Sequence, residues 1–349
     1  MVKELLTLLC DCLEQGRPAA LASVIAHQGS TPRGAGSRLI ADANGLVAGT
    51  IGGGLAEGQT LKACRAALRD GKARILNFAL TGELAAKNDM ICGGSLRVLI
   101  EPLLSSAEYL PFFRAVRDTL SNDGAVLITD ITDTSRPLRT ARIGNAHIGA
   151  SLPEELLDQL LAAVLPKQKA GIHTFEGRNY FIEHCLPPLR MIIAGGGHVS
   201  RPTAQTAALA GFEVTVLDDR AEFSQPERFP WAAHVATVPD YLNCFAGFTP
   251  NPRTYIVIVT RGHLHDSAVL SQALATEAGY IGMIGSTRKR TELYAALRAQ
   301  GVSEEALARV HCPIGLAIGA ETPEEIAVSI VAECIAHRRR ACPPENMPR

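Results

Sequence analysis

The sequence lacks an excess of charge of either sign, and it has few aromatic residues. Its 349 residues include 34 Lys and Arg against 35 Asp and Glu, so the formal net charge is −1, and aromatic residues make up only 5%. A near-neutral chain without long runs of one sign argues against a nucleic-acid partner. No apolar stretch is long enough to span a bilayer, and the N-terminus lacks the pattern of a signal peptide. These absences predict a cytoplasmic protein without a membrane partner.

A disulfide framework is also missing. The chain has nine cysteines, an odd number, and they are scattered without regular spacing. Reduced thiols, as in the cytoplasm, are the simpler interpretation. Hydrophobic residues make up 47% of the chain and charged residues 20%, which is typical of a globular protein with a substantial core. The length predicts two domains of ordinary size.

The chain changes character near residue 165. We expect an N-terminal domain over residues 1–165, a linker with a connecting strand over 166–188, and a second domain over 189–349. In the first domain, short strands alternate with tight glycine turns, which predicts an α+β domain with a mixed sheet. Strands are expected at Ala19–His27, Ser37–Ala41, Leu46–Ile51, Arg74–Leu80, Leu96–Glu101, Ala125–Ile131 and Ala141–Ile148, and helices at Leu55–Leu68, 107–121 and Pro153–Leu165.

The second domain is more regular. Short apolar strands are spaced by helices of ten to fifteen residues, a pattern that indicates βαβ units and a parallel, Rossmann-like sheet of the α/β class. Any ligand is expected at the carboxyl ends of the strands. The expected strands are Arg190–Ala194, Glu213–Leu217, His234–Thr237, Tyr255–Thr260 and Tyr280–Ile284.

The strongest local motif is Gly195-x-Gly197-x-x-Ser200, between an apolar strand and a helix. Gly195 permits a tight turn, and Gly197 lets the backbone approach a pyrophosphate at the helix N-terminus. About twenty positions further on, Asp218 or Asp219 is placed to bind a ribose hydroxyl. Ser200 replaces the usual third glycine. A Rossmann fold retained for its structure alone, with an empty site, is the alternative.

Two further polar segments follow strands of this domain. Gly285 and Ser286 open a helix whose first turn carries three cations, which suits an anionic ligand, although a solvated first turn explains the same residues. His263 and His265 with Asp266 offer metal binding or proton transfer. Capping of the helix by Asp266, with solvated histidines, is the favoured interpretation.

The first domain contains a second glycine turn, Gly49-Thr-Ile-Gly-Gly-Gly-Leu-Ala-Glu57. Consecutive glycines leave backbone amides free to form a concave anion nest. Cys92-Gly-Gly-Ser95 places a thiol in an open turn, where it can contact a soft metal or carry sulfur. A small buried hydrophobe is the commoner fate of a free cysteine. Gly29-Ser-Thr-Pro-Arg33 adds a turn with donors, which hairpin chemistry also explains.

These motifs, in this order, resemble the XdhC/CoxI family of accessory proteins, which mature xanthine dehydrogenase and related molybdenum hydroxylases. The resemblance covers almost the whole chain. Beyond the turns already described, it is carried by these segments: Val98-Leu-Ile-Glu-Pro102, Asp218-Asp-Arg220, Thr260-Arg-Gly-His263, Tyr280-Ile-Gly-Met-Ile-Gly-Ser286, His311-Cys-Pro-Ile-Gly-Leu316 and Thr322-Pro-Glu-Glu-Ile326.

The resemblance implies a chaperone without catalytic residues that binds molybdenum cofactor, as molybdopterin or its dinucleotide form. It implies support for sulfuration of the cofactor, insertion into an apo molybdenum hydroxylase of the xanthine dehydrogenase type, a cysteine desulfurase as partner, and a homodimer in the cytoplasm. On this hypothesis Cys92 is also the metal contact. The cofactor-binding residues are expected to be Arg33, Gly52, Gly53, Gly54, Glu57, Cys92, Gly93, Gly94, Gly195, Gly197, His198, Asp218, Asp219, Gly285 and Ser286.

Two rival hypotheses use the same turn. An NAD(P)-dependent oxidoreductase needs a proton donor beside the nicotinamide, and His198, His263 or His265 are the candidates. A nucleotide-gated scaffold needs only that a bound nucleotide sets the orientation of the domains.

Overall fold

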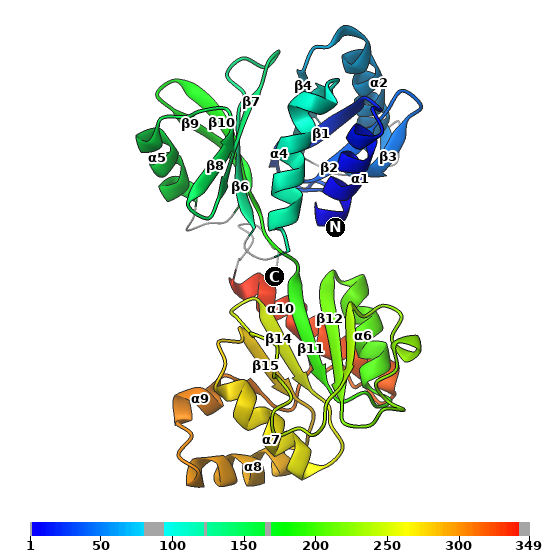
Figure 1. Ribbon diagram of the computed structural model, residues 1–349, viewed down its shortest axis with the longest axis vertical. Coiled ribbons are helices and arrows are strands. Elements are labelled where there is room, and N and C mark those ends of the chain that lie inside the picture. Colours follow the sequence, from blue (N-terminus) through cyan, green and yellow to red (C-terminus); the bar gives the residue numbers. More distant parts are fainter. Residues whose placement is uncertain (1, 80–93, 122–123, 165–168, 342–349) are drawn as a thin grey trace. The chain divides into compact units, whose positions relative to one another are not determined.

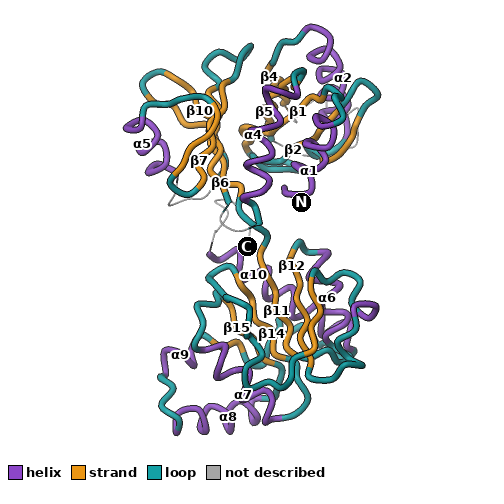
Figure 2. Tube along the Cα trace, in the orientation of Figure 1, coloured by secondary structure: helices purple, strands orange, loops and turns teal. Residues whose placement is uncertain are grey.

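The computed structural model describes residues 2–79, 94–121, 124–164 and 169–341. The chain divides into two compact units, Met1–Pro187 and Pro188–Arg349 (Figures 1 and 2).

The first sheet of unit 1 has five strands in the order β3-β2-β1-β5-β4. Every neighbouring pair is antiparallel, so the mixed sheet predicted for this domain is wrong. The hairpin at Asp42–Gly45 accounts for the antiparallel pairing of β2 with β3, because a parallel pair needs a crossover of a dozen or more residues. The strands are β1 (Ala19–Gln28), β2 (Arg38–Ala41), β3 (Leu46–Gly49), β4 (Arg74–Ala79) and β5 (Ser95–Leu103).

The second sheet of unit 1 is also antiparallel, with the order β8-β7-β6-β10-β9. Two of its strands lie within residues 166–188, for which the sequence predicts a linker and connecting strand. The single strand expected at Ala141–Ile148 is instead a hairpin that turns at Gly144, where φ is +54°. The strands are β6 (Ala125–Asp130), β7 (Leu138–Ile143), β8 (Ala146–Gly149), β9 (Gly171–Phe175) and β10 (Arg178–Cys185).

Helices cover these sheets with their apolar faces. Helix α2 (Gly54–Asp70) buries Cys64 and Ala67 against one face of the first sheet, and α1 (Val2–Glu14) and α4 (Ser106–Thr119) pack together in a separate core. Helix α5 (Glu154–Val164) packs on the second sheet. A small cluster that includes Ile25 and Phe181 joins the two sheets of the unit.

Unit 2 contains a six-stranded, wholly parallel sheet in the order β13-β12-β11-β14-β15-β16. Numbered from β11, this is the order 3-2-1-4-5-6 of dinucleotide-binding folds. The predicted Rossmann-like domain is therefore confirmed, although the short β16 was not predicted. The strands are β11 (Leu189–Ala194), β12 (Phe212–Asp218), β13 (His234–Thr237), β14 (Thr254–Ile258), β15 (Tyr280–Met283) and β16 (Val310–His311).

Strand residues alternate between two cores because successive side chains point to opposite faces. Met191 and Ile193 pack in the core that includes α6 (Ser200–Leu209) and α10 (Pro323–Ala341). Ile192 and Ala194 pack in the core that includes α7 (His263–Leu274) and α8 (Thr287–Ala299). The short α9 (Glu304–Ala308) follows α8, and a 3-10 turn occupies Pro226–Arg228. The order of strands reverses between β11 and β14, where such folds place their ligands.

Candidate functional site

The turn after β11 begins with a residue that must be glycine. Gly195 has φ +110°, and a Cβ there would lie 2.5 Å from the carbonyl oxygen of Val259. Its N–H donates a hydrogen bond to the carbonyl of Leu217 at 2.7 Å. The turn is therefore tight, as the sequence predicts, and the structure places it between the ends of β12 and β14.

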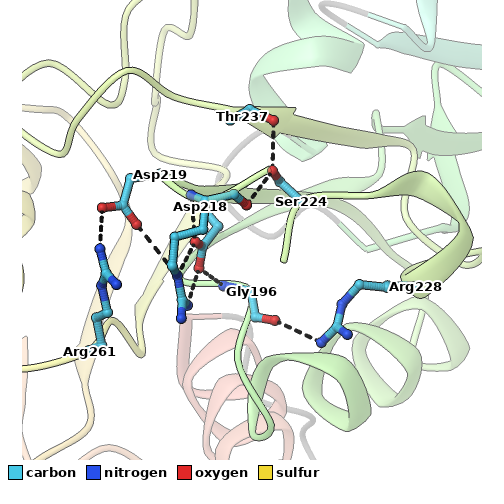
Figure 3. Close-up of polar contacts among 8 residues, drawn as sticks. Gly196, Asp218, Asp219, Ser224, Arg228, Thr237 and Arg261 are labelled. Carbon is cyan, nitrogen blue, oxygen red and sulfur yellow. Dashed lines mark hydrogen bonds and ion pairs between the residues drawn. The ribbon is translucent and has the colours of Figure 1, made fainter. Parts of the chain in front are cut away.

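The next residue, Gly196, is held from both sides (Figure 3). Its N–H donates to Oδ2 of Asp218 at 2.7 Å, and its carbonyl accepts from Arg228 at 3.4 Å. A Cβ at this position would collide with the carbonyl oxygen of Phe223. Sequence reasoning assigned Gly196 no role, although its place within three consecutive glycines was the available signal.

The third residue, Gly197, has no such packing reason to be glycine. A Cβ there would meet nothing within 4 Å. The neighbouring His198 is exposed, and Ser200, at the start of α6, is buried with its Oγ lacking a partner among the described residues. The turn thus presents open backbone, followed by an unsatisfied hydroxyl in the first turn of a helix. This arrangement fits an anionic oxygen ligand.

Asp218 has a structural task in this turn. It is fully buried, and its two oxygens accept from the Gly196 N–H and from three donors of Arg220. Burial alone would raise the pKa of Asp218, but the hydrogen bonds from Arg220 and Gly196 outweigh it and hold the pKa below its usual value. A carboxylate has about four acceptor positions. None is left at Asp218 for a ribose hydroxyl, a role that the sequence gives to either Asp218 or Asp219.

Asp219 is the less buried of the two acidic residues after β12, with 13% of its side chain exposed. It forms an ion pair with Arg261 at 2.8 Å (Figure 3). Arg220 lies 3.7 Å from its other oxygen. Arg261 follows β14 and Asp219 follows β12. The pair therefore joins the two strands that flank β11, beside the glycine turn.

The loop after β15 is built around a buried ion pair. Lys289 contacts the carboxylate of Asp266, which is fully buried and also accepts from Thr260 Oγ1 at 2.5 Å. A Cβ at Gly285 would lie 2.9 Å from Cδ of Lys289, so this glycine makes room for the lysine. Ser286 caps α8, because its Oγ accepts from the N–H of Lys289 at 3.2 Å. Both residues that we expected to bind cofactor here thus take part in the loop's own structure.

The predicted helix cap at Asp266 is wrong. Helix α7 is preceded by Gly262, with no side-chain capping bond, and Asp266 binds Lys289 and Thr260 instead. The ring of His265 lies against Tyr241 at 5.1 Å between centroids. Within the described residues, no group of three or more His, Cys, Asp or Glu could hold a metal ion.

The glycine turn of unit 1 contradicts one expectation. Gly52, Gly53 and Gly54 all have left-handed φ, but the nest amides are not free. Oε2 of Glu57 accepts from the amides of Ile51 and Gly53, at 3.2 and 3.1 Å, and from Thr50 Oγ1 at 2.5 Å. Burial would raise the pKa of Glu57, but these hydrogen bonds lower it overall. The nest is therefore occupied by a carboxylate of the chain itself.

The remaining predicted site residues of unit 1 are Arg33, Cys92, Gly93 and Gly94. A Cβ at Gly94 would collide with the carbonyl oxygens of Gln28 and Ser30, so Gly94 packs against the end of β1 and the turn that follows it. Cys92 and Gly93 lie outside the described residues. Arg33 is exposed and lines a cavity, described below, together with the buried Arg38.

Comparisons with known proteins agree with this geometry. A model described as the XdhC Rossmann domain matches residues 191–334, and one described as the XdhC and CoxI family matches residues 12–79. The chain belongs to the XdhC and CoxI family. The first match coincides with the parallel sheet and its glycine turn, and the second contains Arg33 and the glycine turn of unit 1.

Individual members of this family are distant in sequence. The chain is 28% identical over 341 residues to a Bacillus subtilis protein named as a probable xanthine dehydrogenase component, covering 96% of this chain and 97% of that protein. It is 21% identical over 338 residues to the molybdenum cofactor insertion chaperone PaoD of Escherichia coli, covering 96% and 88%. The uncharacterized Escherichia coli protein YqeB is 27% identical over 330 residues, or 94% of this chain, which spans only 45% of that relative.

A solved structure shares the fold. The crystal structure of a xanthine dehydrogenase from Bacillus halodurans aligns with a TM-score of 0.78 at 24% identity, covering 95% of this chain and 96% of the other. None of the described helices is long and apolar enough to cross a bilayer.

Proposed function

We propose that this protein binds molybdenum cofactor and supports its insertion into a molybdenum hydroxylase of the xanthine dehydrogenase type. One observation carries the proposal: the turn after β11 is fastened at Gly195 and Gly196, while Gly197 faces open space. Two fixed residues followed by an open one describe a preorganised site for a phosphate. Membership of the family, and the name of PaoD, point to the cofactor as the ligand.

The residues of the turn fit the phosphate end of this cargo. Gly197 and His198 would face the phosphate of molybdopterin, or the pyrophosphate of its dinucleotide form, at the N-terminus of α6. Ser200 would add a hydroxyl donor, because its Oγ is buried and has no partner among the described residues. Asp218 is saturated and Asp219 is paired with Arg261, so neither carboxylate is assigned to a ribose hydroxyl.

The finer steps belong to the same proposal. The dithiolene-bound metal prefers sulfur ligands, and Cys92 is the candidate contact. A cysteine desulfurase would supply the sulfur for sulfuration, and the protein would act as a homodimer in the cytoplasm.

The NAD(P) hypothesis has less support. A bound dinucleotide commonly relies on a free carboxylate after the second strand for its ribose. Here Asp218 is consumed by Gly196 and Arg220, and Asp219 is paired with Arg261.

Metal and pterin analysis tests the proposal. The protein and its Gly197→Val variant are purified from a molybdate-replete host, and molybdenum and oxidised pterin are quantified in each. The matched control is Gly171→Val, a glycine at the start of β9 whose Cβ would also meet nothing within 4 Å. We expect the parent and the Gly171→Val control to carry the same amounts of molybdenum and pterin. Gly197→Val should lose both.

Two results contradict the proposal. One is a parent protein that takes up neither pterin nor molybdenum, even from a supplied extract of the free cofactor. The other is a Gly197→Val protein that carries as much cofactor as the control.

A further inference from the structure

Unit 1 contains a cavity of about 380 Å³. It lies against the loop 33–38, the end of β10 and the first turn of α1. Its volume falls near the lower end of the range for small-ligand pockets, roughly 300 to 1,000 Å³. The charged and polar residues on its wall are Arg33, Ser37, Arg38, Thr50, Glu183 and His184.

The charges on this wall do not cancel. Arg38 and Glu183 are an ion pair, and their side chains are only 7% and 8% exposed. Arg33 has no ion-pair partner within the described part of the chain, and Glu183 is the only carboxylate among the described wall residues. Burial lowers the pKa of His184, so its imidazole is neutral at pH 7. The wall therefore carries one uncompensated positive charge, that of Arg33.

One buried donor adds to the anion-favouring character of the wall. Nε of Arg38, which can only donate, is buried without a hydrogen-bond partner among the described residues. Such groups are uncommon in folded proteins and call for a reason. The Cys185 thiol contacts Arg38, and burial raises the pKa of Cys185 to about 11, so it contributes no negative charge.

The cavity wall is also held in place by the backbone. Val24 N–H donates to the Ser37 carbonyl, and Gly36 N–H donates to the Val24 carbonyl, each at 2.8 Å. On the other side, Thr50 N–H donates to the Arg38 carbonyl at 2.9 Å. The loop that carries Arg33 and Arg38 is therefore tied to β1 and to the glycine turn. Leu5, Ala35 and Ala170 give the cavity an apolar part.

We propose that this cavity is a second ligand site, which binds a compact anion through a phosphate or carboxylate group at Arg33, with the body of the ligand against the apolar part. The site lies wholly within unit 1. It depends neither on the Rossmann turn nor on the proposed function, and it stands if that function fails.

Calorimetric titration of the full chain tests the site. To remove the contribution of the other turn, all titrations use the Gly197→Val background. The ligands are inorganic phosphate, pterin-6-carboxylate and neutral pterin. Arg33→Ala removes the charge, Arg33→Lys retains it, and Arg69→Ala removes an exposed arginine on α2, away from the cavity. Because Arg33 is exposed, the variants should fold, and thermal unfolding checks this.

We expect phosphate or pterin-6-carboxylate to bind, and Arg33→Ala to weaken binding roughly ten- to hundredfold, as loss of a charge-assisted hydrogen bond does. Arg33→Lys should recover part of the affinity, and Arg69→Ala should change nothing. Binding of phosphate alone identifies a free inorganic anion as the ligand, whereas tighter binding of pterin-6-carboxylate identifies an organic one. The proposal is overturned if neither anion binds, if neutral pterin binds as well as its carboxylate, or if Arg33→Ala binds like Arg69→Ala.

Discussion

The carboxylate of Asp218 accepts a hydrogen bond from the backbone N–H of Gly196, 2.7 Å away and 22 residues earlier in the chain. The acidic residue after the second strand of the sheet thereby holds the glycine turn after the first strand. Arg220 completes the arrangement by donating to both oxygens of the same carboxylate. Asp218, which the sequence predicts as a ligand contact, thus holds the backbone of the glycine turn in place.

Asp218→Asn should destabilise the protein by about 3 kcal/mol, because it removes the buried carboxylate that pairs with Arg220 and leaves this guanidinium only its longer, 3.7 Å contact with Asp219. Asp219→Asn is the matched control and should cost less than about 1 kcal/mol, since its partner Arg261 is 53% exposed. Urea unfolding at pH 7 measures both. Equal costs for the two variants would contradict the frame role of Asp218.

The same network predicts a pH dependence. The folded pKa of Asp218 lies below its unfolded value, so its stabilisation is present above the unfolded pKa, about 4. The stabilisation is lost as the pH falls through the lower folded value. The difference in unfolding free energy between the parent and Asp218→Asn should therefore shrink below pH 4. A difference that stays constant down to pH 2 would show that folding does not shift the pKa of this carboxylate.

Substitution by alanine should destabilise the protein at one glycine of the turn after β11 and have little effect at the next. Gly196→Ala should be strongly destabilising, by about 2 kcal/mol or more, because its Cβ would press on the carbonyl of Phe223. Gly197→Ala should change stability by less than about 0.5 kcal/mol, because its Cβ meets open space. Thermal unfolding of the two variants compares them. A large loss for Gly197→Ala would mean that this glycine serves packing and not ligand access.

Glu57 should be replaceable by an external anion. Glu57→Ala removes the oxygen that accepts from the amides of Ile51 and Gly53, which costs about 1 to 3 kcal/mol. Acetate or phosphate should then raise the melting temperature of this variant more than that of the parent or of Glu155→Ala, an exposed glutamate of α5. Absence of any selective rescue would argue that the emptied nest does not accept anions.

Breaking the ion pair between Arg38 and Glu183 should lower the stability of the protein strongly. Replacing both residues by apolar ones should not. Glu183→Gln leaves a buried guanidinium unpaired and should cost about 3 to 5 kcal/mol. The double variant Arg38→Met with Glu183→Leu should recover most of this loss, because apolar residues often replace a buried pair without a net cost. A double-mutant cycle by urea unfolding measures the coupling. A single variant that loses less than about 1 kcal/mol would show that the pair is not coupled across the sheets.

Local patterns were enough to predict much of the Rossmann-like unit. The strand before Gly195, the helix after it and the acidic pair at Asp218 and Asp219 lie within about thirty residues, so their spacing predicts a βαβ unit. The role of Asp218 was not predictable in the same way. Whether its oxygens meet a ligand or the chain's own amides depends on how closely β12 lies beside the turn.

In unit 1 the local patterns predicted less. Antiparallel partners can lie at any distance along the chain. The sequence therefore predicts a linker and a connecting strand over 166–188, and it does not reveal that two strands, 171–175 and 178–185, complete the second sheet. The glycine run at Gly52–Gly54 correctly marked an unusual turn with left-handed backbone. It did not reveal that Glu57, four residues beyond Gly53, folds back and occupies the amides.

The amino-acid sequence alone determined which family the chain belongs to, where its glycine turns lie and that a parallel sheet follows residue 188, because these depend on residue order over short distances. The tertiary structure alone decided what those turns have left to offer a ligand. It saturates Asp218 and fills the nest with Glu57, and it pairs Arg38 with Glu183 across 145 residues while leaving Arg33 unpaired within the described residues. Hydrogen-bond capacity is consumed by neighbours in space, and the chain's linear order does not identify those neighbours.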